Sequence, residues 1–340
     1  MKKHVNFLFI ALFILSCENE IPFNVKENPP KLIVNALFDA NKDKNEIILA
    51  LTGQEKVTYI NEASITIYVN GILKDQITKP KSSYNGFDNY KYETAIRFSP
   101  DDVIRLEVIT DDNKHQAQAE IVVPHPIQIE KIDTTIYSNS NGWYNYEDQF
   151  IRIKTTFTDD GKKKNHYRIA MDLNFEIEIE DPVSHKIETI HKTMPGTLIV
   201  REDVVLTDGR PSTEIEDDNG PFVPIQNFYG VFDNSRINGT YTMTTSIQIP
   251  YSFMRYWNGN GAEYVNRIGG SVKVRLLSIS EMQYYYLKAL NIYDSVDYDD
   301  YLSPPVKFPS NIEGGTGIFG VSIGDEFIIP LEDYIPNKGL

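Results

Sequence analysis

The chain has 340 residues, a formal net charge of −15 and 41% hydrophobic residues. This length exceeds the roughly 100–200 residues of one ordinary domain, so we expect two domains or one large β domain. The acidic balance argues against nucleic acid as a partner, because such binding depends on cationic neutralisation of phosphates.

The first residues predict a lipid anchor. Lys2 and Lys3 precede an apolar run over 5–15, which is too short to cross a bilayer but has the length of a signal-peptide core. The run ends in Ile14-Leu15-Ser16-Cys17, which resembles the bacterial lipobox, and Cys17 is the only cysteine of the chain. We therefore expect removal of 1–16 as a signal peptide and acylation of Cys17 by fatty acids such as palmitate. An ordinary secretory signal with a chance cysteine is the alternative.

Residues 17–30 predict an extended tether, because they contain three prolines and little periodicity. Glu18 and Glu20 lie directly after Cys17 and resemble the export signal of surface lipoproteins in Gram-negative bacteria. We expect anchorage in outer-membrane lipid with the chain facing the extracellular side; a merely polar tether is the alternative. Anionic head groups would repel so acidic a chain, so the acyl chains must hold it at the membrane.

Residues 31–124 predict an immunoglobulin-like β-sandwich. Ile65, Ile67 and Val69 alternate strictly along one strand, and Asn70-Gly71 directly after them is a strong hairpin signal. Seven short strands at this spacing are typical of the fold. They are expected over 31–38, 46–51, 64–69, 72–78, 90–98, 103–110 and 116–123. Pro124-His125-Pro126 ends the sandwich as a linker.

Residues 127–340 predict a larger β-rich domain, so the predicted fold class is mainly β. Its strands are expected over 150–158, 167–180, 198–206, 240–249 and 271–279. In the second of these, alternation places one set of apolar side chains on one face: Ile169, Met171, Leu173, Phe175 and Ile177.

One short helix is expected near 280–291. Ser280 is a favourable N-cap residue and Gln283 occupies the capping-box position. Further on, Gly314, Gly315 and Gly317 permit positive φ or close backbone approach. They predict a turn beside the last strand pair, with the apolar residues 318–319 buried. A phosphate-binding role is not expected, because these glycines do not follow a strand and open a helix.

The segment Ser310-Asn-Ile-Glu-Gly-Gly-Thr-Gly-Ile-Phe-Gly320 is the most distinctive part of the chain after the lipobox. Together with the tyrosine-rich helix and Lys31-Leu-Ile-Val-Asn35, it resembles an uncharacterised (domain-of-unknown-function) family of outer-membrane lipoproteins associated with SusC-type TonB-dependent receptors. The resemblance covers nearly the whole chain. It implies a binding or accessory subunit of a SusC-like barrel, in the position that SusD-type lipoproteins occupy elsewhere. SusD-type proteins consist of helical repeats, so that role rests on analogy of position.

Residue patterns predict neither an enzyme nor a cofactor. The six histidines form no HExxH pair, the serines lack a G-x-S-x-G elbow, and acylation of Cys17 leaves no free thiol. The family supplies no catalytic residues. The acidic runs over 214–220 and 294–300 offer oxygen atoms to calcium, but neither has EF-hand spacing, so solvated loops are favoured and no metal site is expected.

The candidate binding residues are aromatic side chains in two loops. Trp143, Tyr144 and Tyr146 lie in one polar loop, and Tyr256 and Trp257 precede an Asn/Gly-rich segment. Amphipathic aromatic side chains are enriched at interfaces; rings that cap the ends of the core are the alternative. A receptor subunit is favoured over two other functions, namely a structural subunit of a larger outer-membrane complex and a free-standing glycan-binding or adhesin module.

Overall fold

The computed structural model describes residues 29–53, 57–80, 90–139, 148–181, 183–210, 227–248, 265–295, 298–299 and 302–331. Within these ranges the chain is mainly β, with three sheets and one α-helix. This confirms the predicted fold class. The predicted signal peptide, and the part of the tether before residue 29, lie outside the described residues.

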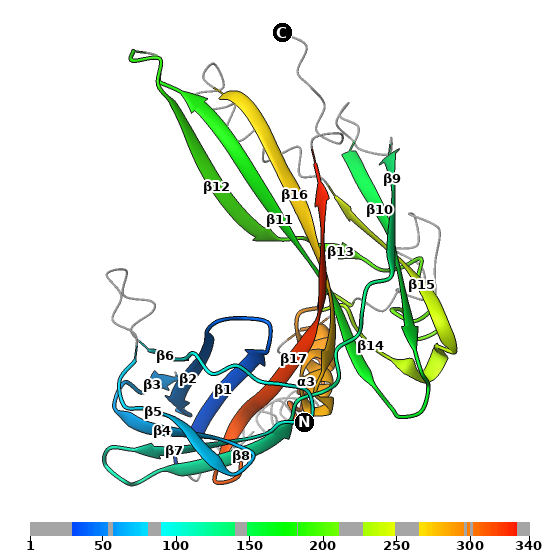
Figure 1. The fold of residues 1–340 in the computed structure, drawn as a ribbon. Helices are drawn as coiled ribbons and strands as arrows, with labels where there is room; N and C mark the ends of the chain where they lie inside the picture. Colours follow the sequence, from blue (N-terminus) through cyan, green and yellow to red (C-terminus); the bar gives the residue numbers. More distant parts are fainter. Residues whose placement is uncertain are drawn as a thin grey trace, which may run out of the picture. The chain divides into compact units, whose positions relative to one another are not determined.

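The N-terminal strands form a two-layer sandwich (Figure 1). One layer contains β1 (Leu32–Asp39), β2 (Asn45–Leu51), β3 (Thr58–Tyr59) and β6 (Lys91–Thr94). The other has the order β5 (Ile72–Ile77), β4 (Ala63–Val69), β7 (Val103–Thr110) and β8 (Gln116–Val122). Alternate apolar side chains of both layers, such as Val34, Ile67 and Leu106, are buried between them. Asn70 and Gly71 have φ of 52° and 76°, as a two-residue hairpin of this type requires, so the predicted turn is confirmed.

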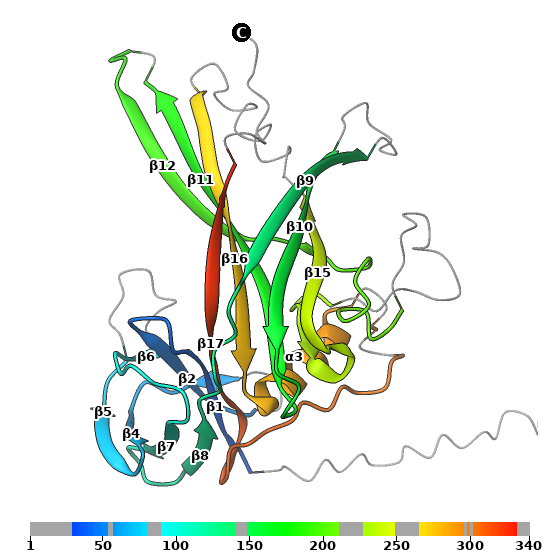
Figure 2. The ribbon, with the colours of Figure 1, turned by 45° about the vertical axis from the view of Figure 1, so that its right-hand side comes forward.

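The second half of the chain forms two facing sheets (Figure 2). One side consists of β11 (His166–Glu180), β16 (Val265–Ile279) and β17 (Gly315–Pro330), with β12 (Ile187–Pro195) and β14 (Val231–Asp233) paired to β11. The facing sheet has the order β13 (Leu198–Ile199), β15 (Gly239–Gln248), β10 (Asp148–Asp159) and β9 (Lys131–Asn139). Ile169, Met171, Leu173 and Phe175 share one face of β11, as predicted, and are buried between the sheets; the side chain of Ile177 lies outside the described residues.

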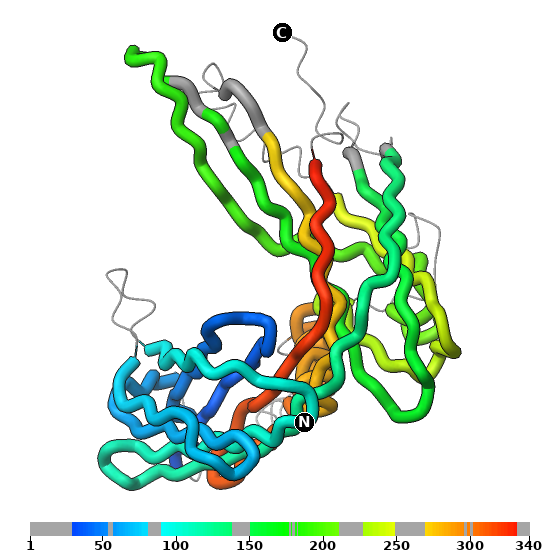
Figure 3. The backbone as a smooth tube through the Cα atoms, viewed as in Figure 1, coloured from blue at the N-terminus to red at the C-terminus, as the bar shows by residue number. Residues whose placement is uncertain are grey.

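Strand β17 belongs to both cores (Figure 3). Its first half, from Gly315 to Ser322, pairs in parallel with β1, and its second half, from Ser322 to Pro330, pairs antiparallel with β16. This produces one continuous strand order, β12-β11-β16-β17-β1-β2-β3. The described residues from Lys31 onward therefore belong to one compact unit. The division into a sandwich over 31–124 and a domain over 127–340 stays a prediction.

The glycines at the start of β17 have a steric role. Gly314 and Gly317 have φ of 77° and 111°. A Cβ atom at Gly317 would lie 2.3 Å from the Val34 carbonyl oxygen on β1, and one at Gly314 would lie 2.3 Å from the Gln116 carbonyl oxygen on β8. Ile318 and Phe319 are buried, as predicted. The segment is a turn only at its start, because parallel pairing with β1 makes the rest a strand.

The predicted strand over 198–206 is the clearest local error. Only Leu198 and Ile199 are in a strand, and turns follow. The cause is Asp203, whose carboxylate accepts hydrogen bonds from the backbone N–H groups of Val205 and Leu206. This side chain offers the backbone a local alternative to sheet pairing, while Val205 and Leu206 are still buried.

Candidate functional site

A cleft of about 980 Å³ is the candidate site. Three segments supply most of its lining: the end of β8 with the residues up to Ile127, the turn between β10 and β11, and the end of β16 with the start of helix α3 (Glu281–Tyr293). Its apolar lining includes Ile121, Val123, Pro124, Pro126, Ile127 and Ile279. The volume is in the range of small-molecule sites, which combine apolar walls with a few polar groups. The polar groups come mainly from the turn between β10 and β11 and from the start of α3.

Asp159 holds the turn between β10 and β11. Its buried carboxylate accepts hydrogen bonds from the Gly161 backbone N–H at 2.6 Å, from the side-chain amides of Asn165 and Asn234 at 3.0 Å each, and from the Tyr167 hydroxyl. Burial alone would raise the pKa of Asp159, but these donors outweigh it and the pKa is lowered. The carboxylate is therefore ionised at neutral pH, and its charge is satisfied within the turn.

The turn presents three consecutive lysines to the cleft. The Lys162 ammonium pairs with Asp160 at 3.2 Å, and Lys164 Nζ donates to the Tyr285 hydroxyl at 3.3 Å. Lys163 is exposed, and its ammonium forms no ion pair with any residue in the described part of the chain. The turn thus adds positive charge to a strongly acidic protein.

His166 begins β11 beside these lysines. Its side chain is 6% exposed, and its ring lies 4.7 Å from the ring of Tyr284 and 6.0 Å from that of Tyr285, measured between centroids. Nε2 is buried and has no hydrogen-bond partner in the described structure. Burial, followed by the nearby Lys164 charge, lowers the pKa of His166, so the imidazole is neutral at pH 7.

Helix α3 begins at the cleft with Ser280, Glu281 and Met282 in the lining. The helix confirms the sequence prediction and extends it to Tyr293. The predicted capping box is wrong: Ser280 Oγ accepts from the Val321 backbone N–H of β17 at 3.3 Å, and no side chain caps the first turn. Gln283 is buried instead of reaching back to Ser280, because the helix packs against β17. The N–H groups of this first turn therefore lack the usual side-chain acceptor.

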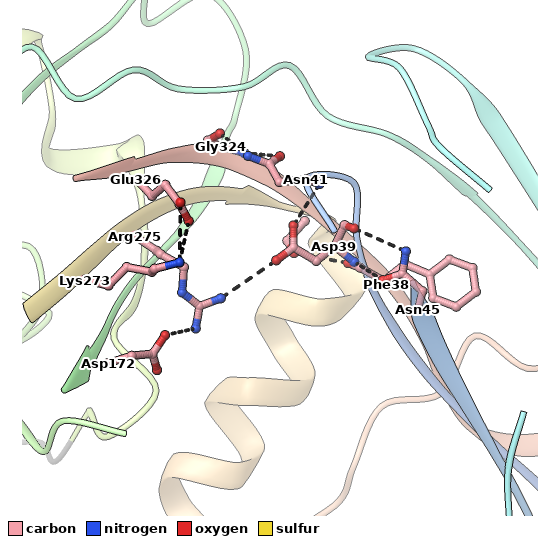
Figure 4. A network of polar contacts seen from close by, with 10 residues as sticks. Phe38, Asp39, Asn41, Asn45, Asp172, Lys273, Arg275, Gly324 and Glu326 are labelled. Carbon is pink, nitrogen blue, oxygen red and sulfur yellow. Dashed lines mark hydrogen bonds and ion pairs between the residues drawn. The ribbon is translucent and has the colours of Figure 1, made fainter. Parts of the chain in front are cut away.

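A second polar cluster lies on the nine-stranded sheet near α3 (Figure 4). Arg275 of β16 pairs with Asp172 of β11 at 3.1 Å and approaches Asp39 of β1 at 3.8 Å. Asp39 is buried, and its carboxylate and backbone also bond to the Asn41 N–H and the Asn45 side chain. These contacts join β1 to the strands of the second core, so the cluster has a structural role.

The sequence-predicted site residues lie outside the described residues. This applies to Cys17, to Trp143, Tyr144 and Tyr146, and to Tyr256 and Trp257. It also applies to the acidic run over 214–220. From the second acidic run, Asp294 accepts from the Tyr229 hydroxyl at 2.5 Å, and Asp299 accepts from the Leu302 N–H in a turn. No group of three or more His, Cys, Asp or Glu side chains suited to a metal occurs among the described residues.

Sequence reasoning missed the cleft. In the sequence, His166 is only one of six histidines, none of which has the spacing of a metal-binding pair. The lysine turn is not part of any predicted site. The available signal was the single run of three lysines, at 162–164, in an acidic chain. This run lies at a cleft only because β8 and α3, from distant parts of the sequence, pack beside it.

Among the described residues, no helix combines the length and the apolar character that a membrane span requires.

Residues 18–326 match the family described as "Domain of unknown function (DUF4249)". The chain belongs to this family. The match covers the cleft and all of both cores except Ile329 and Leu331, and it begins one residue after Cys17. No curated protein matches the chain.

Two solved structures show a weak similarity. A β-glucuronidase from glycoside hydrolase family 2 is 11% identical, with a TM-score of 0.20, over 85% of this chain and 22% of the enzyme. β-Glucuronidase 3 of Bacteroides uniformis is 10% identical, with a TM-score of 0.19, over 74% of this chain and 25% of the enzyme. This chain thus spans about a quarter or less of either enzyme's length, and at these TM-scores the likeness establishes neither a common fold nor a common activity.

Proposed function

We propose that this DUF4249 protein is a lipid-anchored outer-membrane protein that faces the extracellular side and acts as a non-catalytic binding or accessory subunit of a SusC-type TonB-dependent receptor. The observation that carries the proposal is the position of Cys17. It is the only cysteine, it ends a lipobox-like segment, and the family match begins at the next residue. The family match therefore begins directly after the predicted cleavage and acylation site, which supports the proposed anchor.

The mechanism is non-covalent. Two or three acyl chains on Cys17 bury enough CH₂ groups, at about 0.8 kcal/mol each, to give a stable anchor. An anchored protein meets a partner in the same membrane at high effective concentration, so a modest intrinsic affinity is sufficient for a complex.

Strand β12 supports a contact with a partner. It lies at the end of the strand order, and in the described structure only its β11 side is paired. Its side chains are mostly exposed, including Ile187, and Val183 in the preceding turn is exposed as well. An unpaired strand edge offers backbone N–H and C=O groups that a partner's extended segment can pair with.

The test is a mild-detergent purification of tagged protein from outer membranes, followed by mass spectrometry of everything retained. We expect a TonB-dependent barrel protein in stoichiometric amount. Recovery of many stoichiometric barrel and lipoprotein partners would contradict the receptor assignment in favour of an assembly complex. Recovery of no partner would contradict both and leave a free-standing binding module.

The anchor is tested separately with Cys17→Ser. We expect the variant to lose its acyl mass, to leave the membrane fraction and to recover less barrel protein. Surface exposure is tested by adding protease to intact cells, with a periplasmic protein as the control. Protection of the tagged protein until the cells are lysed would contradict the outward-facing orientation.

A further inference from the structure

Two parts of the chain, the start of α3 and the β10–β11 turn with His166, supply the features of the cleft that favour a bound anion. The first turn of α3 has no side-chain cap, and its residues Ser280, Glu281 and Met282 line the cleft. A helix N-terminus carries about half a positive charge and exposes free N–H donors. Lys163 adds an ammonium group without an ion pair among the described residues.

His166 is the independent observation that a ligand group is missing. A buried polar atom without a partner is uncommon and costs about 1–3 kcal/mol, and His166 Nε2 is such an atom at the cleft. Its ring packs on Tyr284 in the first turn of α3, so the imidazole and the free helix N–H groups belong to one side of the cleft. A neutral imidazole can donate one hydrogen bond to an oxyanion.

We propose that this cleft binds a small organic carboxylate. The carboxylate group lies at the first turn of α3, beside His166 and Lys163, and the apolar body of the ligand lies along Ile121, Val123 and Ile279. This site does not depend on a receptor partner, so it stands or fails separately from the proposed function.

The nearby acidic groups set the balance of charge. Asp159 is satisfied by four donors within the turn, and Asp160 pairs with Lys162. Asp233 accepts from the Ser235 backbone N–H. On the β8 side, Asp101 lies 2.9 Å from His125 Nε2, and Glu120 also lines the cleft. Glu281 is in the first turn of α3, where the proposed carboxylate binds. Removal of the Glu281 charge should therefore strengthen binding, whereas removal of the Lys163 charge should weaken it.

The test is titration calorimetry of the full mature lipoprotein in detergent, with benzoate as the probe and benzamide as its uncharged counterpart. We expect saturable benzoate binding and benzamide binding at least about tenfold weaker, since charge-assisted hydrogen bonds are the strong ones. Lys163→Gln should weaken benzoate binding about three- to tenfold, and Glu281→Gln should strengthen it by a similar factor. Lys114→Gln, the same charge change on a lysine outside the cleft, should leave the affinity unchanged.

His166→Phe keeps an aromatic ring against Tyr284 and removes both nitrogens, so it should weaken benzoate binding at least about fivefold. The melting temperature of the His166→Phe variant is also measured, to check that the variant is folded. His166→Gln is the second variant if His166→Phe does not fold. A local readout is the NMR signal of the ¹³C-labelled histidine rings: benzoate should raise the pKa of His166 and leave the signal of His191, an exposed histidine of β12 outside the cleft, unchanged. Equal affinity for benzoate and benzamide, equal effects of Lys163→Gln and Lys114→Gln, or no saturable binding would overturn the proposal.

Discussion

Phe319 of β17 meets the ring of Phe38 of β1 edge to face, with 5.2 Å between the ring centroids. One residue lies near the start of the described chain and the other near its end, and both are fully buried. The same two strands pair in parallel from Leu32↔Gly315 to Asp39↔Ser322. The C-terminal strand therefore completes the core of the N-terminal sandwich.

Replacement of Phe319 by alanine should destabilise the protein strongly. The substitution leaves a cavity beside Phe38 in a closely packed core, and large-to-small changes of this kind cost about 3–5 kcal/mol. The free energy of unfolding is measured by urea titration. Phe327→Ala is the matched control, because Phe327 lies on the same strand but is 45% exposed; we expect a loss below about 1 kcal/mol. Equal losses would contradict the shared-core arrangement.

Gly317→Ala should be far more damaging than Gly239→Ala. Both glycines have positive φ, which costs an alanine about 1–2 kcal/mol. At Gly317 the new Cβ would also lie 2.3 Å from the Val34 carbonyl oxygen, whereas at Gly239 no atom lies within 4 Å. We expect the Gly317 variant to lose β1–β17 pairing, seen as faster hydrogen exchange of β1 amides. Similar stability of the two variants would show that β17 can move away from β1 at little cost.

A fragment that contains only 31–124 should not fold stably. It lacks Phe319 and Val321 from its core and exposes the edge of β1 that β17 covers. Addition of 310–322 through a flexible Gly/Ser linker should restore cooperative thermal unfolding, measured by circular dichroism. The same fusion with Phe319→Ala is the control and should restore less. Cooperative unfolding of the unfused fragment would show that the sandwich is independent of β17.

Asp159→Asn should destabilise the protein at neutral pH by about 1–3 kcal/mol, because the variant loses charge-assisted hydrogen bonds in a buried turn. The folded-state pKa of Asp159 lies below its ordinary value of 3.8. The greater stability of the wild type over Asp159→Asn is therefore fully present above pH 3.8 and is lost as the pH falls through the folded-state pKa of Asp159. Urea unfolding at pH 7 and at decreasing acidic pH measures the difference. Asp160→Asn, a change at an exposed neighbour, should leave stability nearly unchanged and is the control.

Local sequence patterns predicted the strands whose two faces differ in polarity. The alternation around Ile67 and along Ile169–Phe175 marks a buried face, and Asn70-Gly71 has the positive φ values that its hairpin needs. Strands β9, β12 and β17 were not predicted. The mostly exposed β12 shows no apolar alternation, and the glycines of β17 resemble turn residues until their partner strand is known.

The sequence by itself determined the mainly β class and the helix after Ser280, and it predicts the anchor at Cys17, because each depends on residues close together in the chain. Only the tertiary structure decided that β17 completes the first core, since parallel pairing with β1 joins segments from opposite ends of the chain. The same holds for the cleft. Its apolar wall comes from the end of β8, its lysines and His166 from the β10–β11 turn and the start of β11, and its uncapped helix start from α3. Long-range packing rather than local propensity brings such segments together.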